Sequence, residues 1–248
     1  MILKWLLVSD VDDTLVGDDD ALARFARTAD ACDGFGYVLN SSRPVASVAR
    51  TLAGLSVELR PLAVVGAMGT EISIEGAVDE QWADQFNGWD RSEIDRLMAD
   101  FGFQPHANEM QTALKASFDV DKKSLQRVID AIESRAQACR VVISGATNFD
   151  VLPPNAGKGP ATLACLERFG TGDTQLICAG DSANDVELLE VAHFGILVKN
   201  ADGDLRDAVD PRRTYFARKP YAGGVLDGLQ NWGVPISSSS ESIPRRTT

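Results

Sequence analysis

The chain has 248 residues, of which 44% are hydrophobic and 24% are charged, and its formal net charge at pH 7 is −12. This is the composition of a globular protein with enough material for one large domain or two smaller ones. The acidic balance argues against nucleic acid and anionic membrane surfaces as partners, and no stretch approaches the ~18 apolar residues of a membrane span. The four cysteines have no C-x-x-C spacing, so we expect reduced thiols in a cytoplasmic protein.

The first part of the chain alternates between strand and helix patterns. Continuous apolar runs, typical of strands buried on both faces, alternate with segments whose apolar residues recur at helical spacing. We expect a strand at 3–9, a helix at 18–31, a strand at 36–40, a helix at 44–55 and a strand at 62–65. This alternation predicts a parallel sheet with helical crossovers.

The middle of the chain has a different character. A hairpin is expected at 71–78, helices at 90–101 and 122–136, and strands at 113–120, 139–144 and 149–152. The alternation of strands and helices then returns. Helices are expected at 159–169, 184–192 and 223–230, and strands at 174–179, 194–198 and 215–216. The middle unit therefore looks inserted into a parallel-sheet domain.

The predicted fold class is α/β, with a Rossmann-like parallel-sheet core and an inserted α+β cap domain. The core comprises residues 1–78 and 156–236, and the cap comprises residues 79–155. Residues 237–248 contain too few apolar side chains to pack and are expected to form a disordered tail.

An acidic turn, "LLVSDVDDTLVGDD", follows the first predicted strand. Asp10, Asp12 and Asp13 repel one another, and a bound cation would offset that repulsion. One interpretation is that these acids cap the helix that follows. A second is a calcium loop, although Leu15 stands where glycine is required and no helix precedes the turn. The third is a magnesium-dependent phosphoryl-transfer site with an aspartate nucleophile.

The third interpretation requires further acidic and anion-binding groups at other strand ends, because Mg²⁺ takes six oxygen ligands and one carboxylate is insufficient. Such groups follow three predicted strands or precede helices, where backbone N–H groups favour anions. They are Ser41 and Ser42 in "YVLNSSRP", Lys158 in "NAGKGP", and Gly180, Asp181, Asn184 and Asp185 in "LICAGDSANDVELLE".

These residues together resemble the haloacid dehalogenase superfamily of aspartate-nucleophile phosphatases. The four motifs occur in order: D-x-D-x-T (Asp10, Asp12, Thr14), Ser41, Lys158 and G-D-x-x-N-D (Gly180 to Asp185). An insertion between the second and third motifs is similar to the larger α+β cap class. The stretches "GTEI", "LKASFDVD" and "DVLPPNAGKG" resemble sucrose-phosphate phosphatases, a similarity that covers roughly residues 1–232.

One departure concerns the second motif. It usually reads Thr-Gly-Arg in these relatives and reads Ser41-Ser42-Arg43 here. Serine keeps the hydroxyl donor, so phosphate binding should survive. Ser42 in place of glycine narrows the approach to the backbone and so bears on sugar specificity.

The resemblance implies a role for each core residue. Asp10 would attack phosphorus, and Asp12 would act as general acid and then general base. Mg²⁺ would be held by carboxylates of Asp10 and Asp181 and by the backbone carbonyl of Asp12. Phosphate would be held by Ser41, Ser42, Lys158 and Asn184. Asp185 would orient Lys158 or a metal-bound water.

Four other polar residues are candidates for sugar binding. Glu71, Lys115 and Asp150 lie on otherwise apolar cap or hinge strands, and Arg43 lies at the expected domain boundary. The three strand residues would hydrogen-bond sugar hydroxyls, or would simply be solvated strand-face residues. Arg43 would touch phosphate or sugar.

The predicted function is magnesium-dependent hydrolysis of a sugar phosphate, most specifically a disaccharide phosphate such as sucrose 6-phosphate or mannosylfructose phosphate. The expected partner is this small-molecule substrate, and the expected state is a monomer or weak dimer. Two alternatives remain: a phosphosugar mutase that returns the phosphoryl group to a sugar, and a non-catalytic magnesium or sugar-phosphate binding protein.

Overall fold

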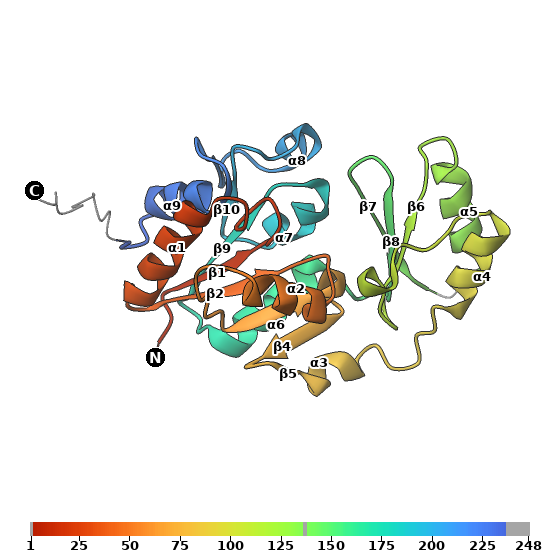
Figure 1. Ribbon diagram of the computed structural model, residues 1–248, viewed down its shortest axis with the longest axis horizontal. Coiled ribbons are helices and arrows are strands. Elements are labelled where there is room, and N and C mark those ends of the chain that lie inside the picture. Colours follow the sequence, from red (N-terminus) through yellow and green to blue (C-terminus); the bar gives the residue numbers. More distant parts are fainter. Residues whose placement is uncertain (1, 136–137, 237–248) are drawn as a thin grey trace, which may run out of the picture.

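The computed structural model describes residues 2–135 and 138–236. The tail expected at 237–248 lies outside the described residues. Two lobes lie side by side, a larger one that holds the long sheet and a smaller one that holds a short sheet (Figure 1).

The larger lobe contains an eight-stranded sheet in the described part of the chain, in the order β11-β10-β9-β1-β2-β3-β4-β5. All pairings from β11 to β3 are parallel, whereas β4 and β5 are antiparallel. The strands are β1 Trp5–Ser9, β2 Phe35–Asn40, β3 Ala63–Gly66, β4 Glu71–Ile74, β5 Ala77–Val78, β9 Gln175–Gly180, β10 Phe194–Leu197 and β11 Thr214–Phe216.

Helices cover both faces of this sheet. Buried Phe25 of α1 and Leu229 of α9 belong to the core on one face, and Cys165 of α6 and Leu188 of α7 belong to the core on the other. The helices of this lobe are α1 Asp19–Ala31, α2 Val45–Ala53, α6 Lys158–Phe169, α7 Val186–Glu190, α8 Gly203–Ala208 and α9 Tyr221–Asn231. Two short 3₁₀ turns, η1 Ala67–Gly69 and η3 Ala183–Asp185, follow strands β3 and β9.

The smaller lobe is an antiparallel sheet with helices on one face. Its strands are β6 Ala116–Asp119, β7 Arg140–Ser144 and β8 Asn148–Leu152, in the order β6-β8-β7. Helices α4 Ser92–Asp100 and α5 Leu125–Arg135 lie on the side away from the larger lobe (Figure 1). Ile94 and Val128 pack there against Phe118 and Phe149. Because strand side chains alternate, Ser117 and Asp150 point to the opposite face.

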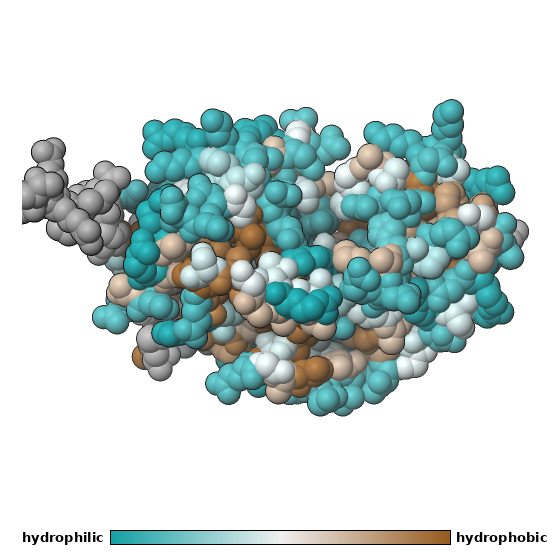
Figure 2. All heavy atoms as spheres, viewed as in Figure 1, coloured by the Kyte–Doolittle hydropathy of each residue, from teal (hydrophilic) through white to brown (hydrophobic). Residues whose placement is uncertain are grey.

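The remaining elements are short. Helix α3 Glu80–Asp84 lies on the path between the lobes, and η2 Asn108–Met110 precedes β6. Among the residues that the structure describes, no helix is long and apolar enough to cross a membrane. Figure 2 shows a mostly hydrophilic surface in this view, with hydrophobic residues in small patches.

The structure confirms the predicted fold class, and several elements differ from those expected. The hairpin expected at 71–78 forms as β4 and β5 and extends the core sheet, within the range 1–78 expected for the core. The strand expected at 113–120 is only β6, because Lys115 folds back on Thr112 in a tight turn. The helix expected at 184–192 is a 3₁₀ turn, η3, followed directly by the short helix α7. A capping box, in which the Asp185 carboxylate accepts the backbone N–H of Ser182, marks its beginning. Helices α3 and α8 were not expected.

Candidate active site

The candidate site lies where the core sheet changes direction. Strand β1 is flanked by β2 on one side and β9 on the other. The strands that follow β2 in sequence extend the sheet on its side, and the strands that follow β9 extend it on the opposite side. Ligands of open parallel sheets bind outside the carboxyl ends of the strands at such a switch point. Asp10 follows β1, Ser41 follows β2, and Asp181 follows β9, so parallel pairing brings the first, second and fourth motifs to one edge.

Lys158 joins two of the aspartates. It begins helix α6, and its Nζ lies 2.6 Å from Oδ1 of Asp10 and 2.6 Å from Oδ1 of Asp185. The Lys158 side chain is completely buried, and Asp10 is only 6% exposed. The third motif is thereby joined to the first and the fourth.

Electrostatics in this cluster are dominated by burial. Burial raises the pKa of Asp10 well above its usual value, although Lys158 opposes this, and repulsion from Asp185 and Asp181 adds to it. Burial alone would lower the pKa of Lys158, but attraction to Asp10 and Asp185 outweighs it, so the pKa of the ammonium lies above its usual value. Its two carboxylate partners therefore favour the cationic form of Lys158.

Asp181 is the third acidic member of the cluster. Its Oδ1 accepts a hydrogen bond of 2.9 Å from the Thr14 hydroxyl. Burial, with repulsion from Asp185 second, raises the pKa of Asp181 to about 7. Carboxyls held this close resist ionisation unless a cation compensates them.

A divalent cation fits this donor set. Carboxylate oxygens of Asp10, Asp181 and Asp185 lie within 4.8 Å of one another. Both oxygens of Asp185, however, already accept hydrogen bonds. Oδ1 accepts from Lys158, and Oδ2 accepts from the backbone N–H groups of Asp181 and Ser182. Oxygen ligands for Mg²⁺ are thus better supplied by Asp10 and Asp181, and Asp185 orients its neighbours.

Asp10, Asp12 and Asp13 do not cap the helix that follows. Asp18 is the N-cap of α1 and accepts the N–H of Ala21 at 2.9 Å. A strand precedes the turn, unlike in a helix-loop-helix calcium site. Asp13 has a left-handed backbone (φ 60°), and its carbonyl accepts a hydrogen bond from Nδ2 of Asn200. These contacts give Asp13 a structural role in the turn.

Asp12 is exposed, unlike the buried cluster, and pairs with Arg43. Nε and Nη2 of Arg43 donate to the two oxygens of Asp12 at 2.7 and 2.8 Å. Nη1 donates to the hydroxyls of Ser47 and Thr51 on α2, at 3.3 and 2.9 Å. The guanidinium is therefore held in one orientation, and it engages the predicted acid–base residue.

The other predicted phosphate ligands surround this region. Ser41 is buried, and its hydroxyl oxygen accepts the backbone N–H of Arg43 at 3.1 Å, which leaves its proton free to donate. Ser42 is half-buried. Asn184 lies in η3, and its Oδ1 is buried without a partner among the described protein groups.

Lys115 and Asp150 lie inside the cap and are not solvated strand-face residues. Lys115 is 1% exposed and Asp150 is 6% exposed. Lys115 Nζ lies 3.2 Å from Asp150 Oδ1 and donates to the carbonyl of Met110, while the Ser117 hydroxyl donates to Asp150 at 2.5 Å. The two residues thus form one hydrogen-bonded network that spans β6 and β8.

Glu71 lies in the core, at the beginning of β4. Its Oε2 accepts the backbone N–H of Val45 at 2.8 Å, at the start of α2. The lobes are tied together elsewhere, by Arg140 of β7, whose Nη1 lies 2.5 Å from Oε1 of Glu187 on α7. Arg140 also donates to the carbonyl of Ala156 in the connection that returns to the core.

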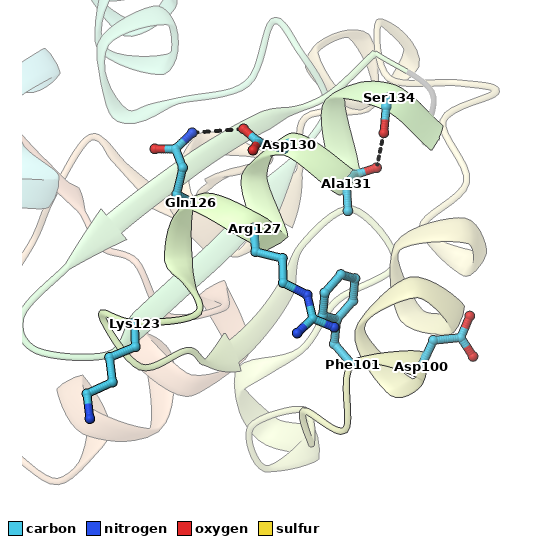
Figure 3. Close-up of a pocket in the computed structure, with 8 residues that line it drawn as sticks. All are labelled: Asp100, Phe101, Lys123, Gln126, Arg127, Asp130, Ala131 and Ser134. Atoms are coloured by element: carbon cyan, nitrogen blue, oxygen red, sulfur yellow. Dashed lines mark hydrogen bonds between the residues drawn. The ribbon is translucent and has the colours of Figure 1, made fainter.

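A surface groove of about 730 Å³ lies elsewhere on the cap (Figure 3). Arg127 of α5 lies over the ring of Phe101 there, 4.5 Å from its centroid. The groove contains none of the predicted site residues. It is lined by Asp100, Phe101, Lys123, Gln126, Arg127, Asp130, Ala131 and Ser134.

Sequence reasoning missed several residues that hold the site together. Thr14 belongs to the first motif but was given no role, and it hydrogen-bonds Asp181. Ser47 and Thr51 anchor Arg43. Asn40, the last residue of β2, donates a hydrogen bond from Nδ2 to the backbone carbonyl of Lys158. The only sequence signal for Asn40 is a polar residue at the end of an otherwise apolar strand.

Comparisons with known proteins agree with this arrangement. The family described as sucrose-6F-phosphate phosphohydrolase matches residues 3–233. A mannosylfructose-phosphate phosphatase from Agrobacterium fabrum is 28% identical over 243 residues, which cover 92% of this chain and 97% of that protein. A probable sucrose-phosphatase from Arabidopsis thaliana is 26% identical, and the match covers 97% of this chain and 62% of that protein. The chain thus spans less than two thirds of the length of this plant relative.

A solved structure shares both lobes. The sucrose-phosphatase from Synechocystis, determined in complex with sucrose and phosphate, superposes with a TM-score of 0.85 at 26% sequence identity. The match covers 93% of this chain and 98% of that one.

Proposed function

Because the chain belongs to the sucrose-6F-phosphate phosphohydrolase family of the haloacid dehalogenase superfamily, we propose that it hydrolyses a sugar phosphate through an aspartyl-phosphate on Asp10. The observation that carries the proposal is the Asp10–Lys158–Asp185 arrangement, with both Nζ to Oδ1 distances at 2.6 Å. A buried carboxylate beside a fixed cation is suited to attack an anionic phosphoryl group, since the cation offsets the repulsion between the two anions.

In the first step, a carboxylate oxygen of Asp10 forms a bond to phosphorus, and the bond from phosphorus to the sugar oxygen breaks. Asp12 donates a proton to that leaving oxygen. In the second step, Asp12 takes a proton from water, whose oxygen attacks phosphorus and releases Asp10. Splitting the reaction in this way replaces one difficult step by two easier ones. Lys158, Ser41 and Asn184 hold the phosphoryl oxygens in both steps.

The acidic residues would also hold magnesium. Asp10, Asp181 and the backbone carbonyl of Asp12 would bind it, and Asp185 would keep Lys158 in place. When bound, Mg²⁺ supplies positive charge that stabilises the transferring phosphoryl group. The raised pKa values of Asp10 and Asp181 support this assignment, because a bound cation would favour the ionised form of both carboxyls.

The proposed substrate is a disaccharide phosphate, with sucrose 6-phosphate and mannosylfructose phosphate as the candidates. The names of the relatives support this class. Ser117 and Asp150 lie on the face of the cap sheet opposite its helices, and the buried network that they form with Lys115 would recognise the sugar. Arg43 and Glu71 stay candidates for the boundary between phosphate and sugar.

The test is phosphate release from a panel of sugar phosphates and one aryl phosphate, each with and without EDTA. We expect the highest kcat/KM with a disaccharide phosphate and loss of activity in EDTA. Equal turnover with and without EDTA would show that the mechanism does not need the metal. Isomerised sugar phosphate without free phosphate would identify a mutase. Binding without any turnover would identify a non-catalytic protein.

A further inference from the structure

Asn40 is a fully buried amide next to the phosphate-binding segment. It ends strand β2, immediately before Ser41, and has no exposed surface. Its Nδ2 donates to the backbone carbonyl of Lys158 at 3.1 Å and to the hydroxyl oxygen of Thr162 at 3.1 Å. Two segments that are 118 residues apart in sequence are thus joined by one side chain.

The orientation of this amide follows from its partners. The Thr162 hydroxyl donates its own proton to the Lys158 carbonyl at 2.7 Å. Its oxygen is then available only as an acceptor, and the Lys158 carbonyl is also an acceptor. Both groups facing Asn40 therefore require a donor, and only the NH₂ end of the amide supplies two donors.

This cross-link has a geometric consequence for the site. Ser41 and Lys158 are proposed to hold oxygens of the same phosphoryl group, but they come from β2 and from the first turn of α6. Asn40 fastens those two backbones to each other. A misplacement of about 1 Å at a reacting centre can cost on the order of a hundredfold in rate, so the distance between these backbones matters.

Stability alone does not explain an amide here. Oδ1 of Asn40 is buried and accepts no hydrogen bond from the described protein groups. An unpaired buried carbonyl destabilises a fold, and an apolar side chain of similar volume would avoid that cost. With such an apolar side chain, the Lys158 carbonyl would still accept its hydrogen bond from the Thr162 hydroxyl.

We propose that Asn40 is a positioning residue that acts through Lys158, by fixing the start of α6 against the strand that carries Ser41. The inference rests on the proposed phosphatase function. It concerns how the phosphate subsite is pre-organised, and Asn40 itself does not touch the substrate.

The test is a double-mutant cycle between Asn40→Leu and Lys158→Met. kcat and KM are measured with an aryl phosphate, orthophosphate binding is measured by calorimetry, and each variant is checked by thermal unfolding. Thr162→Val is the matched control, because it removes the neighbouring hydroxyl and keeps the Asn40 to Lys158 hydrogen bond. Asn40→Asp, which has the same shape and an acceptor in place of the NH₂ donor, replaces Asn40→Leu if that variant does not fold.

Asn40→Leu should lower kcat/KM by about ten- to a hundredfold and weaken orthophosphate binding, with an unfolding midpoint close to that of the wild type. In the Lys158→Met background the same substitution should have almost no further effect. Thr162→Val should keep most of the activity. Full activity of Asn40→Leu, or an equal loss in both backgrounds, would overturn the proposal while leaving the phosphatase function intact. A wild-type protein that neither turns over substrate nor binds orthophosphate would refute both.

Discussion

The guanidinium of Arg43 binds the carboxylate of Asp12 through two N–H···O hydrogen bonds of 2.7 and 2.8 Å. Bidentate pairs of this kind fix direction as well as distance. Ser47 and Thr51 hold the other side of the guanidinium, so α2 controls where the Asp12 carboxylate lies. This contact of Arg43 with Asp12 differs from the predicted contact with phosphate or sugar.

Arg43→Lys should therefore impair protonation of the leaving group more than phosphate binding. Lysine keeps the charge but cannot form the planar two-bond pair. General acid catalysis contributes typically 10²–10⁴-fold, and we expect a loss on the order of ten- to a hundredfold in kcat with a sugar phosphate. An aryl phosphate, whose leaving group needs little protonation, should lose much less. Equal losses with both substrates would indicate that Arg43 binds the phosphoryl group instead.

Magnesium binding should weaken as the pH falls below about 7. Burial raises the pKa of Asp181 to about 7, so below that value the cation must displace a proton, and above it the carboxylate is already ionised. Asp181→Asn should bind magnesium more weakly and show a flatter pH dependence. Calorimetric titration of the EDTA-stripped protein with MgCl₂ at pH 6 and pH 8 measures both effects. Equal affinities at the two pH values would argue against Asp181 as a ligand.

Lys115→Met should affect the cap in two ways. It leaves the buried carboxylate of Asp150 without its cation, and breaking a buried pair typically costs about 3–5 kcal/mol. It should also lower kcat/KM for a disaccharide phosphate more than for an aryl phosphate, because the aryl compound needs little from the cap.

The double variant Lys115→Met/Asp150→Asn separates these two effects. It removes the unpaired charge and should recover much of the stability, as followed by urea unfolding. The preference for the disaccharide phosphate should stay low. Recovery of both stability and preference would mean that the pair supports only the fold of the cap.

The positions of the first, second and fourth motifs could be predicted because each follows an apolar run that reads as a buried parallel strand. Asp10 and Asp181 end neighbouring strands β1 and β9, and parallel pairing necessarily brings them to one edge. The cap contacts could not be predicted in the same way. The bond between Ser117 and Asp150 joins residues 33 apart through antiparallel register, which single-sequence patterns leave open.

Side-chain competition for backbone groups explains other differences. Asp185 was expected inside a regular helix, but its carboxylate accepts two backbone N–H groups in the 3₁₀ turn where that helix begins. Asn40 carries no motif of its own, and its partner Lys158 lies 118 residues away. Such contacts depend on how α6 packs against β2.

Asp10→Asn should abolish turnover with little change in fold, since it keeps the volume and removes the nucleophile. Asp13→Asn is the matched control: Asp13 is exposed in a left-handed turn, a conformation that asparagine tolerates well. The control should retain activity close to that of the wild type. Phosphate release from an aryl phosphate measures both variants.

The most direct measurement is acid-quenched mass spectrometry of the phosphoenzyme. Asp12→Asn should still be phosphorylated by an aryl phosphate with a good leaving group but should release the phosphoryl group slowly, because no base activates water. We expect one phosphoryl group on the peptide that contains Asp10, and none when Asp10→Asn is added. Turnover by the wild-type protein without a phosphorylated Asp10 peptide in any quenched sample, or a phosphoryl group on another residue, would contradict the mechanism.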